Sequence, residues 1–170
     1  MNKTITEGAL TFTFAVGAEA DKYDDWSFYR NQFQQGCSVD NKAVDLLCEF
    51  DRNAWLIEVK DYRLHARTKA VDLADEVAIK VRDTLAGLVA ASVGANDPHE
   101  RAFARRMVRA QRMRVVCHIE QPAKSSRLRP RVIEPDKLRL KLRTLLKAID
   151  AHPTVIDKNR KDASLPWQVT

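Results

Sequence analysis

Residues 43–63, AVDLLCEFDRNAWLIEVKDYR, contain two apolar runs separated by a short polar segment. Residues 42–50 and 54–62 have the length and the β-branched and aromatic content of strands. Asp51-Arg52-Asn53 between them is typical of a turn, so we expect a β-hairpin. In its second strand Glu58 and Lys60 are two residues apart, and both side chains must therefore point to the same face.

The position of Asp45 on the first strand depends on the register of this hairpin. With Phe50 as the last paired residue, a two-residue turn places Asp45 opposite Glu58, and a four-residue loop places it opposite Lys60. A three-residue loop without a bulge would instead put Asp45 on the other face. Two of the three registers therefore predict an acidic pair beside a lysine.

Two adjacent carboxylates are costly unless a cation joins them, and their oxygen atoms suit Mg²⁺ or Mn²⁺. We expect Asp45, Glu58 and the carbonyl of Val59 to be the metal ligands. Lys60 would orient or deprotonate a water on that metal, or stabilise developing negative charge. The alternative is a solvated strand edge, where Glu and Lys are common. The interruption of an apolar strand by both residues favours a site.

The segments Ala43-Val44-Asp45-Leu46-Leu47 and Trp55-Leu56-Ile57-Glu58-Val59-Lys60-Asp61-Tyr62-Arg63 resemble the core of the PD-(D/E)XK nuclease superfamily. This resemblance implies the restriction-endonuclease-like α/β fold, a central mixed β-sheet flanked by α-helices. It also implies metal-dependent phosphodiester hydrolysis of nucleic acid, with DNA favoured over RNA. The alternatives are a catalytically inactive nucleic-acid-binding module or a protein-interaction subunit of the same fold.

This chain departs from the family pattern at one position and leaves another position open. Val44 stands where the pattern has a proline before Asp45. Many members also carry a further acid on a helix before the hairpin. Glu19, Asp21, Asp24 and Asp25 all precede the hairpin here, and any of them could fill this fourth catalytic position. Asp24 is the one that we select as the candidate.

Basic residues are concentrated in one part of the sequence. Residues 1–100 hold 11 Lys or Arg against 17 Asp or Glu, whereas residues 101–147 hold 15 against 3. Such asymmetry is expected of a metal site beside a phosphate-binding surface, although basic residues also solvate helix faces. The candidate nucleic-acid-binding residues are Arg63, Lys69, Arg105, Arg109, Arg127, Arg129 and Arg131.

The remaining patterns predict one domain over residues 1–170. We expect a strand at 10–16, a loop and short helix at 18–35, helices at 68–93, from Pro98 and at 136–149, a strand at 114–120 and a short strand from Thr154. The aromatic residues of 23–29 are expected in the core. His118 and Glu120 are expected to be a polar pair at a strand end next to the site.

The sequence lacks an apolar run long enough for a membrane span and a signal-peptide pattern at its start, which predicts a cytoplasmic protein without a membrane partner. Its three cysteines form no CxxC pair, and we expect buried thiols. A homodimer or a separate partner subunit is compatible with these patterns.

Overall fold

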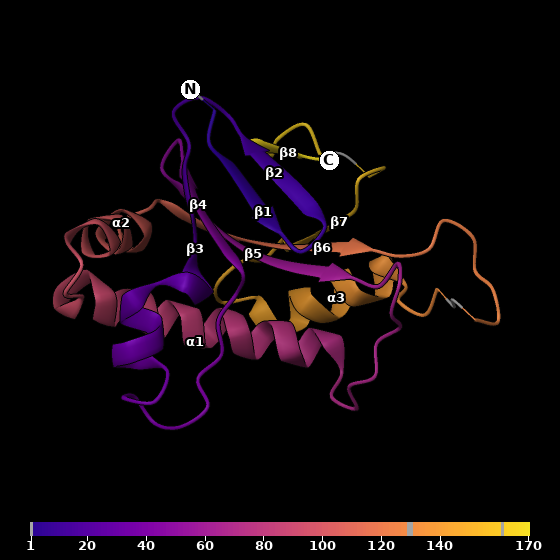
Figure 1. Ribbon diagram of the computed structural model, residues 1–170, viewed down its shortest axis with the longest axis horizontal. Coiled ribbons are helices and arrows are strands. Elements are labelled where there is room, and N and C mark those ends of the chain that lie inside the picture. Colours follow the sequence, from indigo (N-terminus) through magenta and orange to yellow (C-terminus); the bar gives the residue numbers. More distant parts are fainter. Residues whose placement is uncertain (1, 129–130, 161) are drawn as a thin grey trace.

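A mixed β-sheet forms the centre of the fold (Figure 1). The computed structural model describes residues 2–128, 131–160 and 162–170, and in them this sheet has the strand order β3-β4-β5-β6-β7. Strands β3, β4 and β5 pair antiparallel, whereas β5, β6 and β7 run parallel. The expected α/β class with a mixed sheet is confirmed. The strands are β3 (Glu19–Lys22), β4 (Leu46–Phe50), β5 (Asn53–Asp61), β6 (Arg112–Glu120) and β7 (Thr154–Ile156).

A tight turn between β4 and β5 sets the register of the hairpin. Phe50 pairs with Asn53, so the turn consists of Asp51 and Arg52, whose φ angles are 47° and 59°. Positive φ at both central residues is the type I′ geometry that matches the twist of a hairpin. Because Leu46 pairs with Ile57, the preceding residue, Asp45, lies opposite Glu58. The hairpin therefore has the register that was expected for a two-residue turn.

Helices cover one face of the central sheet (Figure 1). Helix α1 (Leu73–Gly94) packs against α2 (Pro98–Val108) and α3 (Pro135–Leu146), and their apolar side chains share a core with Leu47, Leu56 and Val115. Asp72 and Asp97 cap α1 and α2 by accepting hydrogen bonds from backbone N–H groups of the first turn. Among the helices that the structure describes, none is both long enough and apolar enough to cross a membrane.

A second sheet covers the opposite face. It consists of β1 (Thr4–Glu7), β2 (Leu10–Phe14) and β8 (Trp167–Val169), in the order β1-β2-β8. Phe12, Phe14 and Trp167 pack there against Ile57 and other residues of the central sheet. Because that face of β5 is also apolar, it needs a covering layer, and a sheet supplies it. The expectation that helices flank the sheet was therefore right for one face only.

The segment before the hairpin contributes a strand and two short helical turns, η1 (Tyr23–Asp25) and η2 (Tyr29–Phe33). Its aromatic side chains are buried in the helix-side core, as expected. Tyr23 lies so close to α1 that a Cβ added at Gly87 would clash with its hydroxyl oxygen. Cys48 and Cys117 are buried, but Cys37 is exposed after η2, where a buried thiol was expected.

Candidate functional site

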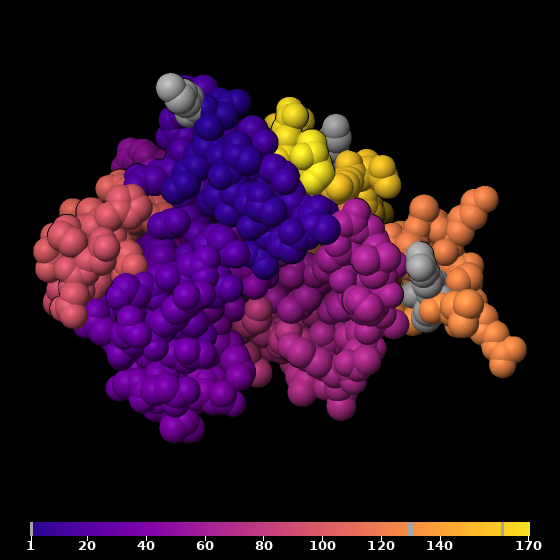
Figure 2. Space-filling view, viewed as in Figure 1, coloured from indigo at the N-terminus to yellow at the C-terminus, as the bar shows by residue number. Residues whose placement is uncertain are grey.

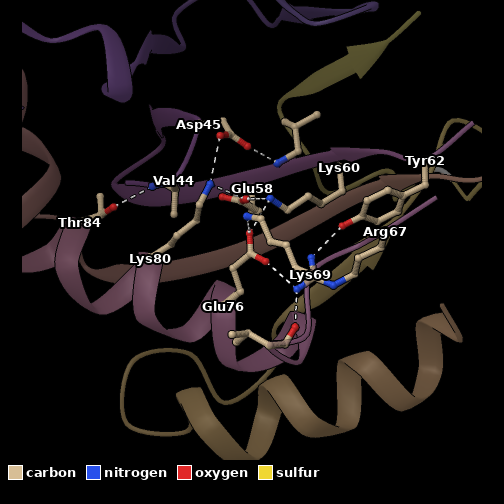
Figure 3. Close-up of polar contacts among 12 residues, drawn as sticks. Val44, Asp45, Glu58, Lys60, Tyr62, Arg67, Lys69, Glu76, Lys80 and Thr84 are labelled. Carbon is tan, nitrogen blue, oxygen red and sulfur yellow. Dashed lines mark hydrogen bonds and ion pairs between the residues drawn. The ribbon is translucent and has the colours of Figure 1, made fainter. Parts of the chain in front are cut away.

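Asp45 and Glu58 lie side by side on the sheet face that α1 covers (Figure 3). The Val59 N–H donates a hydrogen bond of 2.6 Å to Oδ2 of Asp45, which fixes this carboxylate across the hairpin. The side chain of Glu58 is fully buried, whereas 15% of that of Asp45 is exposed. The hairpin therefore holds two acidic groups together, one of them without access to water.

Two lysines neutralise this acidic pair. The Nζ atoms of Lys60 and Lys80 each lie 2.6 Å from Oε1 of Glu58. Lys80 Nζ also lies 3.4 Å from Oδ1 of Asp45, so its ammonium group bridges the two carboxylates (Figure 3). Within the described residues, Oε2 of Glu58 is buried and has no hydrogen-bond partner.

Glu76 on α1 forms the other end of the cluster. Its Oε1 lies 3.0 Å from Lys60 Nζ and 2.9 Å from Lys69 Nζ, and its Oε2 lies 2.7 Å from Arg67. Arg67 also donates a 3.2 Å hydrogen bond to the hydroxyl of Tyr62. Glu76 thus ties the connection between β5 and α1 to the helix. Lys69, predicted to contact phosphate, is engaged in this network.

A polar stripe on α1 produces these contacts. Glu76, Lys80 and Thr84 are spaced four residues apart and so lie on one helix face. Thr84 Oγ1 accepts a 3.0 Å hydrogen bond from the Val44 N–H. Sequence reasoning missed Glu76 and Lys80, although their regular spacing beside Val77 could have revealed them.

The electrostatic surroundings shift the pKa values of Glu58 and Glu76 in opposite directions. Burial and the nearby charge of Asp45 raise the pKa of Glu58 to about 7, against the effect of the two lysines. Burial also acts to raise the pKa of Glu76, but Lys69, Lys60 and Arg67 lower it to about 2. Burial opposes the charge on Lys80, yet Glu58 and Asp45 raise its pKa. Glu76 and Lys80 are therefore charged at neutral pH, while Glu58 titrates near it.

Asp24, predicted as a fourth acid, lies in η1 next to this cluster. The neighbouring Tyr23 N–H donates a 3.1 Å hydrogen bond to the carbonyl of Asp45. Burial, followed by the charge of Asp45, raises the pKa of Asp24. Its Oδ1 is buried and unpartnered within the described residues. The structure brings Asp24 towards Asp45, and its role stays a prediction.

The cluster offers an incomplete ligand set for a metal ion. Asp45 and Glu58 supply two carboxylates, and the free Oε2 of Glu58 is a suitable donor for Mg²⁺ or Mn²⁺. In the part of the chain that is described, however, no group of three or more His, Cys, Asp or Glu residues is placed to hold a metal. The Lys80 ammonium already compensates both carboxylates, so a divalent cation would have to displace it.

His118 lies on the other face of the sheet from Glu58. Glu58 pairs with Cys117 and Val59 with His118 in the parallel ladder, and paired residues share a face. His118 contacts Phe12 of the second sheet, and its Nε2 lies 2.8 Å from Oε1 of Glu120. The expected pairing with Glu120 is confirmed, but the expected position next to the acidic site was wrong.

The predicted basic residues divide between two ends of the molecule. Arg63 and Arg131 line one cavity of about 490 Å³ together with Lys124 and Lys158. Arg127 lies on the same connection, whose described residues 121–128 and 131–134 project from the body of the protein (Figure 2). Arg129 lies outside the described residues.

Arg105 and Arg109 belong to the opposite end. Both lie at the C-terminal end of α2, far from the projecting connection (Figure 1). Arg105 Nε donates a 2.7 Å hydrogen bond to the Ser92 carbonyl. The structure therefore does not join these two arginines to the basic cavity.

Comparison with known proteins gives one informative similarity. The Cysteine--tRNA ligase of Neisseria meningitidis serogroup A / serotype 4A (strain DSM 15465 / Z2491) is 33% identical to this chain over 157 residues. The match covers 75% of this chain and 22% of the ligase, so the chain spans about a fifth of that relative's length. No protein-family model matched the chain, and no solved structure matched it.

This similarity overturns the nuclease interpretation. The relative is a ligase, so the assignment to the PD-(D/E)XK nuclease superfamily and the expected phosphodiester hydrolysis were wrong. The short pattern of Asp45, Glu58 and Lys60 led to the wrong function because it describes only the local geometry of one hairpin. The same local geometry can occur in proteins with different activities. That pattern also does not include Lys80, which lies on α1 and bridges both acids.

Proposed function

We propose that this chain is an RNA-binding module and that transfer RNA is the RNA it binds. The observation that carries the proposal is the cavity at the ends of β5 and β6, where Arg63, Lys124, Arg131 and Lys158 come together. Phosphate contacts by such side chains supply most of the non-specific affinity for nucleic acid. Arg63 is partly neutralised by Asp61, to which it donates bonds of 2.9 and 2.6 Å. Lys124 and Arg131 have no ion-pair partner among the described residues.

The similarity supports the choice of RNA. The relative's name specifies a transfer RNA ligase, and the match covers 75% of this chain. DNA was favoured only through the resemblance to nucleases, which the similarity to a transfer RNA ligase contradicts. The projecting connection also suits an irregular RNA surface, since proteins recognise RNA mainly through shape, backbone contacts and unstacked bases. We do not propose that this chain ligates cysteine to transfer RNA, because the match covers only 22% of the ligase.

Several finer assignments remain predictions. The hairpin, α1 and the parallel strand β6 support a restriction-endonuclease-like arrangement, which is compatible with RNA binding because a fold does not fix an activity. Mg²⁺ or Mn²⁺ at Asp45 and Glu58, with the Val59 carbonyl, would compensate the two carboxylates if Lys80 moved away. The single domain, the cytoplasmic location and a homodimer or partner subunit also stay predictions.

Binding should be measured by fluorescence anisotropy with a transfer RNA transcript and a DNA duplex of similar length at several salt concentrations. We expect tighter binding to the transfer RNA and a linear fall of log K with log salt concentration. Replacing Lys124 and Arg131 by Glu should weaken binding by at least about 10-fold. The matched control replaces Arg105 and Arg109 by Glu, which makes the same charge change at the other end of the molecule.

The outcomes separate the alternatives. Equal weakening by both pairs of substitutions would show that overall charge, and not this cavity, determines binding. Tighter binding to the DNA duplex would contradict the assignment to RNA. No binding at low salt would exclude the proposal and favour a protein-docking role for the basic surface.

A further inference from the structure

Two adjoining cavities wrap around the edge strand β7, away from the acid–lysine cluster. The first, about 620 Å³, lies between α3 and β7, and the second, about 400 Å³, lies between β7 and β8. Ile156, Arg160, Asp162 and Ala163 line both cavities. A ligand could therefore extend from one into the other, and each volume is within the range of small-molecule sites.

The first cavity is suited to an anion. Arg139 and Arg143 line it from α3, four residues apart on the same helix face, and Arg160 lines it from the segment after β7. Arg160 lies 3.5 Å from Asp136, another lining residue. Neither Arg139 nor Arg143 has an ion-pair partner in the described ranges. Two free guanidinium groups on one wall are well placed for the bidentate recognition of a phosphate.

The second cavity is suited to a planar ring with polar edges. His118 and Trp167 line it, and the two side chains are almost fully buried, with 1% and 6% exposed. His118 Nδ1 and Trp167 Nε1 have no hydrogen-bond partner among the described residues. Leu165 and Ile156 supply apolar surface. Buried polar atoms without partners are uncommon in folded proteins, and a ligand that displaced the side chains covering these two nitrogens could satisfy them.

We propose that these cavities bind one unstacked nucleotide of the RNA, with its phosphate on Arg139 and Arg143 and its base in the pocket of His118 and Trp167. This inference rests on the proposed function only for the source of the nucleotide. A base needs both flat apolar surface and hydrogen-bonding groups, which line the second cavity, and a phosphate needs fixed cations, which line the first. An acidic peptide would satisfy the arginines but would not explain the ring nitrogens.

The test is a titration of the ¹⁵N-labelled full chain with AMP, GMP, CMP and UMP, followed by NMR. We expect at least one mononucleotide to shift the indole N–H signal of Trp167, and inorganic phosphate alone to leave that signal unchanged. Replacing Arg139 and Arg143 by Glu should weaken this binding by at least about 10-fold. The same change at Arg105 and Arg109 is the matched control and should leave it unaltered. Ala163→Trp, at an exposed residue shared by both cavities, should abolish the shift in a folded protein.

The experiment distinguishes the absence of a nucleotide site from the absence of RNA binding. If no mononucleotide at about 10 mM shifts the Trp167 signal of the folded protein, the nucleotide site does not exist, even if transfer RNA binds. If a mononucleotide binds and transfer RNA does not, the pocket is real and the RNA-binding role is wrong. A shift that survives both Ala163→Trp and the arginine replacements would place the nucleotide elsewhere and overturn the inference.

Discussion

Lys80 Nζ lies 2.6 Å from Oε1 of the fully buried Glu58, so a lysine from α1 compensates the most deeply buried acid of the sheet. Removing one partner of such a pair is costly because the other charge remains buried and uncompensated. The contact therefore links the helix to the hairpin electrostatically, and it controls how Glu58 titrates and whether another cation can approach.

The stability of the protein should depend on the protonation of Glu58. Its pKa is raised from 4.5 to about 7 on folding. Its stabilising contribution is therefore complete below pH 4.5 and is lost as the pH rises through about 7. Urea unfolding of the wild type and Glu58→Gln from pH 4.5 to 7.5 should show the wild type losing about 1–3 kcal/mol relative to the variant.

Glu76 is a control whose effect on stability should depend on pH in the opposite direction. Its pKa is lowered to about 2, so its contribution is present above pH 4.5 and is lost as the pH falls towards 2. Glu76→Gln should therefore lower the free energy of unfolding near pH 7 and have less effect in acid. Parallel stability curves for wild type and Glu58→Gln would contradict the raised pKa of Glu58.

Divalent cations should bind more tightly when Lys80 is removed. Lys80→Met takes away the ammonium group that bridges Asp45 and Glu58, and of the two lysines that neutralise this pair only Lys60 then compensates the carboxylates, through Glu58. Calorimetric titration should show Mn²⁺ affinity rising by about 10-fold or more. Lys69→Met, which removes a lysine that contacts Glu76, is the control and should change affinity little. Unchanged affinity in Lys80→Met would rule out this pair as a cation site.

The connection between β5 and α1 should loosen when Glu76 loses its charge. Glu76 binds Arg67 and Lys69 of this connection. Glu76→Gln should speed hydrogen exchange of the amides in residues 62–72 by about 10-fold, while those of β5 and β6 stay protected. Asp75→Asn is the control, since Asp75 pairs with Lys141 on α3 instead. Equal exchange in wild type and Glu76→Gln would show that the connection is held by other contacts.

The close approach of α1 to Tyr23 predicts contrasting effects at two glycines of this helix. Gly87→Ala introduces a Cβ that clashes with the buried Tyr23 side chain, whereas a Cβ at Gly94 meets no atom within 4 Å. Gly87→Ala should lower the free energy of unfolding by about 1–3 kcal/mol. Gly94→Ala should leave it nearly unchanged or raise it. Thermal unfolding of the two variants measures the difference, and similar melting temperatures would contradict the packing.

The sequence was informative where neighbouring residues determine structure. Two apolar runs with Asp51-Arg52-Asn53 between them predicted the β4–β5 hairpin, and the register that pairs Phe50 with Asn53 was among the alternatives. The long helix α1 followed from its apolar spacing. These features depend on contacts within one or two elements, which local patterns describe well.

Features that depend on distant contacts were beyond such patterns. Lys80 reaches Glu58 only after α1 packs on the sheet, and His118 falls on the opposite face because of the parallel pairing of β5 with β6. β1 was missed because it is very short, and β8 because it follows Pro166. The functional interpretation failed for a related reason, since a few residues around one hairpin cannot specify an activity.

The four-residue spacing of Glu76, Lys80 and Thr84 has a consequence for how this chain can vary in length. Each residue of an α-helix turns the chain by about 100°. One residue inserted between Leu73 and Glu76 could be absorbed by shifting the helix start, but one inserted between Glu76 and Thr84 would rotate one part of the stripe away from the hairpin. Insertions and deletions should therefore be excluded from this stretch of α1.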